Sequence, residues 1–328
     1  MSRKQKLIYS LIGLVVLLVV LFVVSKLVAW RERAIGDITT QTNEAGTITI
    51  GVMNPSLITD MSWTYEGETY SMEYRSGVWD KVTDVAFPVN QTVLSDMTSA
   101  ISSLTANQGI PNVSDMEPYG LVVPSMTIKI KADNERLTYK IGDKNELTGE
   151  YYLQLNTLST VYLVDADIVE TFSKGLFEIM QVETVPEYGT TASATIENAN
   201  GTIQILHEKT DDGERWYLDD ENQTLLDSSA ASKLVNYGLG VSWLDCDTYQ
   251  ATEYYLESCG LTEPRAKITL TDTDGNSFTL VFGNETEGGT LAQFEGSDIV
   301  YVVGTDTADY LANATVESLL PAQTDEAA

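Results

Sequence analysis

Apolar and polar residues alternate with two different periods along most of the chain. In residues 126–130 and 268–270 every second residue is apolar, the pattern of a strand with one buried face. Residues 93–104 instead place their apolar side chains on one stripe of a helix. Pairs that favour hairpin turns, such as Asp274-Gly275, separate the strand-like runs. The pattern predicts an α+β fold whose strands are mainly antiparallel.

The same order of elements occurs twice, with an offset close to 140 positions. Each copy contains a Gly-Leu pair with a Pro three residues after the Leu, then an alternating run, a polar turn and a second strand-like run that ends in Gly. Gly permits the positive φ at which a helix ends, Leu is expected in the core, and Pro restricts the turn before the strand. The motif is therefore structural rather than chemical. Its residues are Gly120, Leu121 and Pro124 in the first copy, and Gly260, Leu261 and Pro264 in the second.

The correspondence extends upstream of this motif. Trp79 matches Trp216, and the Asn-Gln-Thr triplet at 90–92 matches the triplet at 222–224. Because Asn is a preferred N-cap residue, both triplets are predicted to open a helix.

The repeat predicts two homologous, mainly antiparallel β modules, each with one or two helices. Residues 183–192 contain Pro186 and Gly189 and suit a linker between the modules. The predicted parts are a cytoplasmic tail (1–6), a transmembrane anchor (7–29), a stalk (37–49), repeat module 1 (50–182), a linker (183–192), repeat module 2 (193–320) and a flexible tail (321–328).

The N-terminal segment predicts a membrane anchor. The eighteen residues 7–24 carry no charge, and with the apolar residues that follow Lys26 they are long enough to span a bilayer at about 1.5 Å per residue. The alternative, a cleaved signal peptide, needs a small-residue cleavage site where Lys26, Trp30 and Arg31 stand. Basic residues flank both ends of the segment, so they do not fix its orientation. The short N-terminal tail favours a single-pass protein of the cell membrane with an extracytoplasmic body.

Charge is distributed unevenly along the chain. The formal net charge is -29, yet the first 36 residues hold six basic side chains and one acidic one. The remaining residues hold 13 basic and 47 acidic side chains. Such a surface repels phosphate-rich polyanions, so nucleic-acid binding is not expected.

The sequence carries no recognisable catalytic, cofactor or metal motif. His207 is the only histidine, so one chain cannot supply a multi-histidine metal centre. The segment from Asp272 to Asn276 resembles the start of a calcium loop, but the Gly and Glu that such a loop requires are out of register. A hairpin turn explains it better. We therefore predict a non-enzymatic protein with no cofactor.

Cys246 and Cys259 are the only cysteines, thirteen positions apart in the second copy. In an exported domain they could form a disulfide that closes a short loop. Unpaired and buried thiols are equally compatible with the spacing.

The combination of an N-terminal apolar helix and these short motifs resembles the bacterial "domain of unknown function 4340" family. The second copy departs from the pattern, with Cys259 before Gly260 and Leu291-Ala292 in place of Tyr151-Tyr152. The resemblance implies an accessory role beside ABC-2-type export permeases or gliding-motility-type transport systems, and it supplies no catalytic residues. The residues that carry it are Trp79, Tyr119-Gly120-Leu121, Pro124, Ile141-Gly142, Tyr151-Tyr152 and Val161-Tyr162.

Two functional hypotheses follow, beside the third possibility of a purely structural stalk. The first is a membrane-anchored, extracytoplasmic, partner-binding module whose partner is an ABC-2-type permease or another envelope component. The alternative is a domain that binds or hydrolyses a cell-envelope polymer, using a cleft between the two modules. Paired carboxylates for hydrolysis could come from the 48 acidic residues, but no pair is marked by its sequence context.

Overall fold

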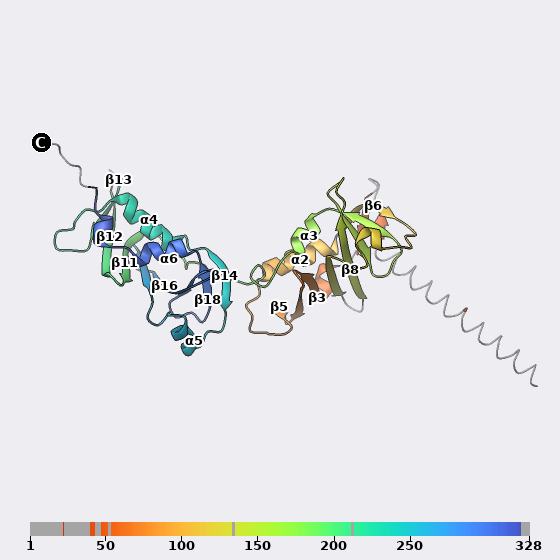
Figure 1. Cartoon of the computed structure of the whole chain (residues 1–328), viewed down its shortest axis with the longest axis horizontal. Helices are drawn as coiled ribbons and strands as arrows, with labels where there is room; N and C mark the ends of the chain where they lie inside the picture. The colour runs from red at the N-terminus through yellow and green to blue at the C-terminus, as the bar shows by residue number, and fades with distance from the viewer. Residues whose placement is uncertain are drawn as a thin grey trace, which may run out of the picture. The chain divides into compact units, whose positions relative to one another are not determined.

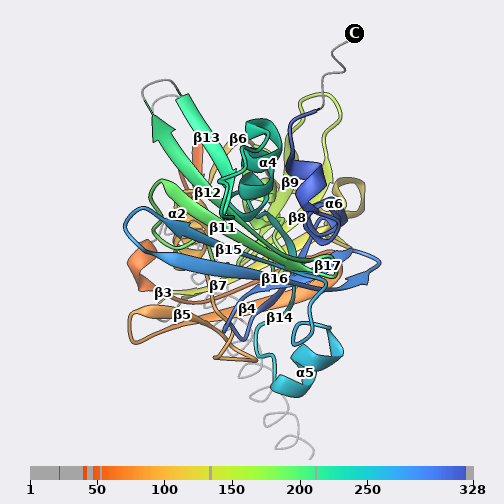
Figure 2. The same ribbon diagram turned by 90° about the vertical axis from the view of Figure 1, so that its left-hand side faces the viewer.

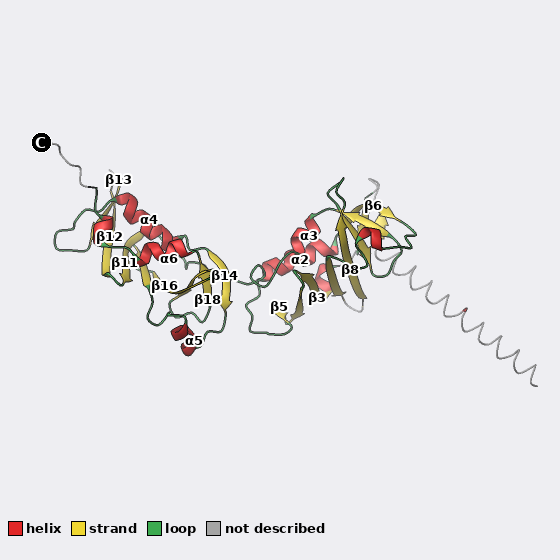
Figure 3. Ribbon diagram, viewed as in Figure 1, coloured by secondary structure: helices red, strands yellow, loops and turns green. Residues whose placement is uncertain are grey.

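The computed structural model describes residues 22, 40–42, 47–51, 54–132, 135–210 and 213–322. The chain forms two compact units, Met1–Gln181 and Val182–Ala328 (Figure 1). Both are built from an antiparallel sheet with a few helices, so the predicted α+β class is confirmed (Figure 3).

The predicted tail 1–6 and anchor 7–29 lie outside the described residues, apart from Phe22. Within the described ranges, no helix is both long enough and apolar enough to cross a membrane.

The first unit contains a ten-stranded sheet in the order β1-β2-β6-β10-β9-β8-β7-β3-β4-β5. Its strands are β1 (Thr40–Thr42), β2 (Ile48–Ile50), β3 (Ile58–Tyr65), β4 (Glu68–Arg75), β5 (Val78–Lys81), β6 (Thr105–Ile110), β7 (Met126–Ala132), β8 (Glu135–Lys144), β9 (Tyr151–Leu155) and β10 (Val161–Val164). Its helices are α2 (Gln91–Ser102), α3 (Asp167–Phe172) and the short 3-10 turns η1 (Pro55–Leu57) and η2 (Glu117–Tyr119).

Helix α2 forms where the sequence predicts it and packs its apolar stripe into the core. The Asn90 side chain caps the helix by accepting hydrogen bonds from the backbone N–H groups of Thr92 and Val93, at 3.1 and 3.2 Å. Leu94 and Ile101 on this helix are fully buried. Helices α2 and α3 cover one face of the sheet, and none of the described helices covers the opposite face of the central strands (Figure 1).

Part of the segment predicted as a stalk is sheet. Strand β1 pairs with β2, and β2 continues the sheet by pairing with β6. The N–H of Ile50 donates to the carbonyl of Leu104 at 2.6 Å, and the Ile50 side chain is fully buried.

The second unit contains an eight-stranded sheet in the order β14-β18-β17-β16-β15-β11-β12-β13. Its strands are β11 (Thr191–Asn198), β12 (Gly201–Thr210), β13 (Gly213–Leu218), β14 (Trp243–Thr248), β15 (Ala266–Asp272), β16 (Ser277–Thr286), β17 (Gly289–Phe294) and β18 (Val300–Val303). Its helices are α4 (Ser228–Leu239), α5 (Glu253–Ser258), α6 (Thr305–Ala312) and α7 (Val316–Leu319).

Strand for strand, this order repeats the run from β6 to β5 in the first unit. Helices α4 and α6 lie on the same side of the second sheet, where both contact β15 (Figure 2).

The prediction that residues 222–224 open a helix is wrong. Helix α4 begins at Ser228, with Asp227 as its N-cap. The Asp220 side chain accepts hydrogen bonds from the N–H groups of Asn222 and Thr224, so it holds this triplet in a turn that continues β13.

The Gly-Leu-x-x-Pro motif occupies the same place in both units. Gly120 ends η2 and Gly260 follows α5, with φ of 68° and 70°. Leu121 and Leu261 are buried. Each Gly lies against the end of the second strand of the following hairpin, close to Asp143 in one unit and Asn284 in the other.

The predicted linker is fastened to the second unit. The N–H of Glu183 donates to the Tyr301 hydroxyl at 2.9 Å, and the Trp243 indole N–H donates to the Glu183 carbonyl at 2.8 Å. The Gly189 N–H donates to the Asp272 carboxylate at 2.9 Å. Residues 183–189 are therefore part of the packed structure.

Candidate binding site on the first sheet

Basic side chains gather on the uncovered face of the first sheet. Along β7 and β8 the inward residues are buried, so the alternate residues point away from the core. Four of these outward positions hold Lys129, Lys131, Arg136 and Lys140. Residues 37–181 contain only eight basic side chains, and five of them lie on these two adjacent strands, the fifth being Lys144 at the end of β8.

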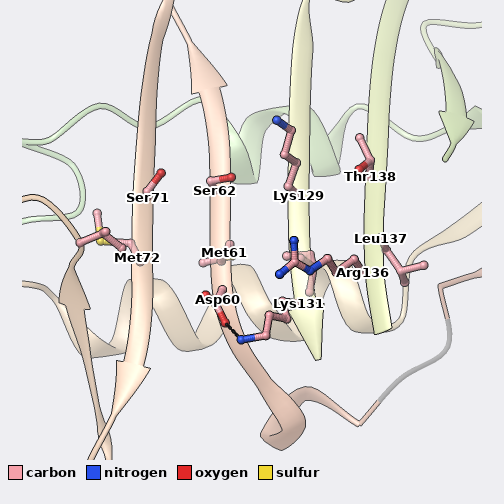
Figure 4. A pocket seen from close by; sticks show the side chains of 12 residues that line it. Asp60, Met61, Ser62, Ser71, Met72, Lys129, Lys131, Arg136, Leu137 and Thr138 are labelled. Carbon is pink, nitrogen blue, oxygen red and sulfur yellow. Dashed lines mark hydrogen bonds and ion pairs between the residues drawn. The ribbon is translucent and has the colours of Figure 1, made fainter. Parts of the chain in front are cut away.

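A shallow depression of ≈ 360 Å³ lies on this face, over β3, β4, β7 and β8. Its polar lining forms two rows across the strands (Figure 4). The first row consists of Ser71, Ser62, Lys129 and Thr138, which are neighbours in the strand register. The second row consists of Asp60, Lys131 and Arg136.

Asp60 partly neutralises the second row. Its carboxylate accepts from the Lys131 ammonium at 3.0 Å and from the Thr59 hydroxyl at 2.7 Å. Burial would raise the pKa of Asp60, but these hydrogen bonds and the nearby charges of Lys131 and Arg136 outweigh it, so the pKa is lowered. Asp60 is therefore ionised at neutral pH and compensates Lys131.

The remaining cations are not compensated. Within the described part of the chain, no acidic side chain forms an ion pair with Lys129, Arg136 or Lys140. In addition, Lys131 and Arg136 are directly opposite each other on neighbouring strands, an arrangement that destabilises a sheet when both residues have the same charge.

The hydroxyl groups of the first row are also available. Among the described residues, the Ser62, Ser71 and Thr138 hydroxyls make no hydrogen bond to another protein group. The depression thus presents two uncompensated cations and three hydroxyl donors, a set that suits an anion with several oxygen atoms.

The second unit differs at the same positions. Matching the strand registers places Thr269, Thr271 and Ser277 where the first unit has Lys129, Lys131 and Arg136. The Thr269 hydroxyl lies 2.8 Å from that of Thr279, so these two groups satisfy each other. The positive charge is therefore a property of the first unit and not of the fold.

Sequence reasoning did not identify this site. The one signal for it in the sequence is a lysine at alternate positions of β7, in a chain that is otherwise acidic. The matching strand β15 has threonine at these positions, so comparison of the two copies does not mark the lysines. Only the register places Arg136 beside Lys131 and brings Ser62 and Ser71 into the same row.

The two cysteines are free thiols in the structure. Cys246 lies in β14, and burial together with Asp245 and Asp247 raises the pKa of its thiol to about 11. Burial also raises the pKa of Cys259, which is the C-cap of α5. Both groups are therefore protonated at neutral pH, which makes them weak nucleophiles and weak metal ligands.

His207 has a structural environment in β12. Its ring stacks on Trp216 with centroids 4.3 Å apart, and Nδ1 lies 2.8 Å from the Thr191 carbonyl. Within the described ranges, no group of three or more His, Cys, Asp or Glu side chains could hold a metal ion. Asp272 and Asn276 form the β15–β16 hairpin turn that the sequence favours over a calcium loop.

The sequence model of the family described as "Domain of unknown function (DUF4340)" matches residues 79–255, which is more than half of the chain. The chain belongs to this family. The DUF4340 match begins in β5 of the first unit and ends in α5 of the second, so it includes β7 and β8 with the basic face. No curated protein and no solved structure matches the chain.

Proposed function

We propose that this member of the DUF4340 family is a membrane-anchored, extracytoplasmic, non-enzymatic module that binds a partner through the basic face of its first sheet. The partner is an ABC-2-type export permease or another envelope component. The two units are copies of one repeated module, of which the first has acquired the charged face. Their matching strand order and the 140-residue offset of the Gly-Leu-x-x-Pro motif support this view.

One observation carries the proposal. Lys129 and Arg136 are exposed and uncompensated among the described residues, although the chain as a whole has 48 acidic side chains. Packing and folding do not require these charges, because the second unit has Thr269 and Ser277 at the same positions. A charged group that the fold does not need, at an uncovered surface, indicates binding.

Co-purification tests the proposal. The full chain, with a C-terminal tag, is crosslinked in intact cells, extracted with a mild detergent and analysed by mass spectrometry. We expect a permease or envelope component with the wild type, and at least a tenfold smaller yield with the double variant K129T/R136S.

K144T serves as the control variant, because Lys144 lies at the end of β8 and does not line the depression. It should leave the yield unchanged. A partner that is recovered equally with all three proteins would contradict binding through the basic face, and recovery of no partner would contradict the proposed function altogether.

A further inference from the structure

We infer that the depression around Lys129 and Arg136 is a binding site for a phosphate ester carried by the partner. This inference rests on the proposed function, because it names the chemistry that the same face recognises.

The donors of the depression match a phosphate better than a carboxylate. Arg136 can offer a planar pair of N–H groups, and the Lys129 ammonium offers three further donors. The hydroxyls of Ser62, Ser71 and Thr138 extend the row, with no protein acceptor among the described residues. A phosphate ester presents three or more acceptor oxygens to these donors, whereas a carboxylate has two.

The positive charges on β7 and β8 are arranged in a way that favours binding of an anion. Lys131 and Arg136 face each other across β7 and β8, and among the described residues Asp60 forms an ion pair with Lys131 whereas none forms one with Arg136. An anion between Lys129 and Arg136 would relieve this repulsion. In the second unit, the Thr269 and Thr279 hydroxyls bond to each other, and the neutral residues Thr269 and Ser277 stand at the positions of Lys129 and Arg136.

The total charge of the chain decides between two sources of phosphate. An extended anionic bilayer surface would also face acidic side chains outside the basic face, and the net charge of -29 shows that these outnumber the basic ones, so they oppose close contact even in a membrane-anchored protein. A single ester group interacts mainly with charges within about 8 Å at physiological salt, where the basic side chains dominate. We therefore assign the site to the phosphate of a soluble or polymer-linked ester and not to lipid headgroups.

The test is a calorimetric titration of the detergent-solubilised full chain with glycerol 3-phosphate, in a chloride buffer that contains no phosphate. We expect saturable binding of one equivalent. The variants K129T and R136S, which introduce the residues found in the second unit, should each weaken it by about tenfold or more. K144T should bind as the wild type does.

Three outcomes would overturn the inference. The first is that glycerol 3-phosphate does not bind. The second is that K129T and R136S bind it as tightly as the wild type does. The third is that a hexaglutamate peptide, or vesicles of phosphatidylcholine and phosphatidylglycerol, bind although the soluble ester does not. If the ester does not bind but partner recovery still depends on Lys129 and Arg136, the proposed function stands and only the phosphate chemistry is wrong.

Discussion

Lys131 and Arg136 line the proposed binding site in an arrangement that reduces local stability. They face each other across β7 and β8, and like charges in that position destabilise a sheet. Their counterparts Thr271 and Ser277 have no such conflict. Asp60 offsets the charge of Lys131, but no described acidic side chain forms an ion pair with Arg136, and positions where a local rule is broken in this way are typical of functional surfaces.

The variant R136S should therefore lose binding without losing stability. Removing the repulsion should leave the free energy of unfolding within about 0.5 kcal/mol of the wild type, with any change in the stabilising direction. Denaturant titration in the absence of phosphate measures it, and the difference should shrink as salt is added. A clear loss of stability would assign Arg136 a structural role instead.

Asp272 predicts a pH dependence of stability. Hydrogen bonds from the Asn276 side chain, from the Gly189 N–H and from other backbone N–H groups lower its pKa to about 2. In the unfolded chain the pKa of Asp is about 3.9. The ionised carboxylate therefore stabilises the fold above about pH 4, and this contribution is lost as the pH falls towards 2.

The variant D272N tests this contribution. It should be less stable than the wild type at pH 7, because the neutral amide is a weaker acceptor for these donors. The difference in melting temperature should stay constant down to about pH 5 and then shrink between about pH 4 and pH 2. A difference that does not change over the acidic range would show that the charge of Asp272 is unimportant.

The sequence predicted best those elements in which apolar residues recur with the regular spacing of a strand or a helix. The alternation in residues 126–130 and the stripe in 93–104 correspond to β7 and α2. Strands β1 and β2 have three residues each, too few to show a period, so their segment looked like a stalk. The turn at 222–224 was missed because the side chain of Asp220, and not that of Asn222, organises the local hydrogen bonds.

The basic face could not be predicted for a different reason. It depends on the register of β3, β4, β7 and β8, which brings together residues far apart in the sequence. Ser62 and Thr138 are 76 positions apart, and neither has a sequence context that marks it. The internal repeat marks residues that the two units share, whereas Lys129, Lys131 and Arg136 have neutral counterparts in the second unit.

Gly142 and Gly283 lie near the ends of the matched strands β8 and β16, where there is no room for a side chain. A Cβ at Gly142 would lie 2.0 Å from the Tyr119 carbonyl oxygen, and one at Gly283 would lie 2.3 Å from that of Cys259. The backbone around each Gly-Leu motif would have to move. We expect G142A and G283A each to lower the free energy of unfolding by about 1–3 kcal/mol.

Gly304 provides the matched control. A Cβ there would meet no atom within 4 Å, and its φ of -59° suits any residue. G304A should leave the unfolding free energy within about 0.5 kcal/mol of the wild type, as measured by denaturant titration. If G142A and G283A unfold like G304A, the strand ends do not pack as tightly as the structure indicates.

Both units are net acidic, but the second is more strongly acidic than the first. Residues 182–328 contain 27 acidic and five basic side chains, whereas residues 37–181 contain 20 and eight. An acidic surface of this kind repels polyanions, and under our proposal the basic face is a local exception. Binding at such a face should weaken as salt is raised, because exposed charges are screened.

We propose that the first unit, and not the second, binds the partner through the sheet face that no described helix covers. Thr138 and Thr279 offer a matched pair of probes, since they are the same residue type at the same register position of β8 and β16. The most direct measurement places a photo-crosslinking amino acid at either position of the full chain in intact cells. We expect an adduct with a permease or envelope component from position 138 and none from position 279. Adducts of equal yield from both positions, or from position 279 alone, would contradict it.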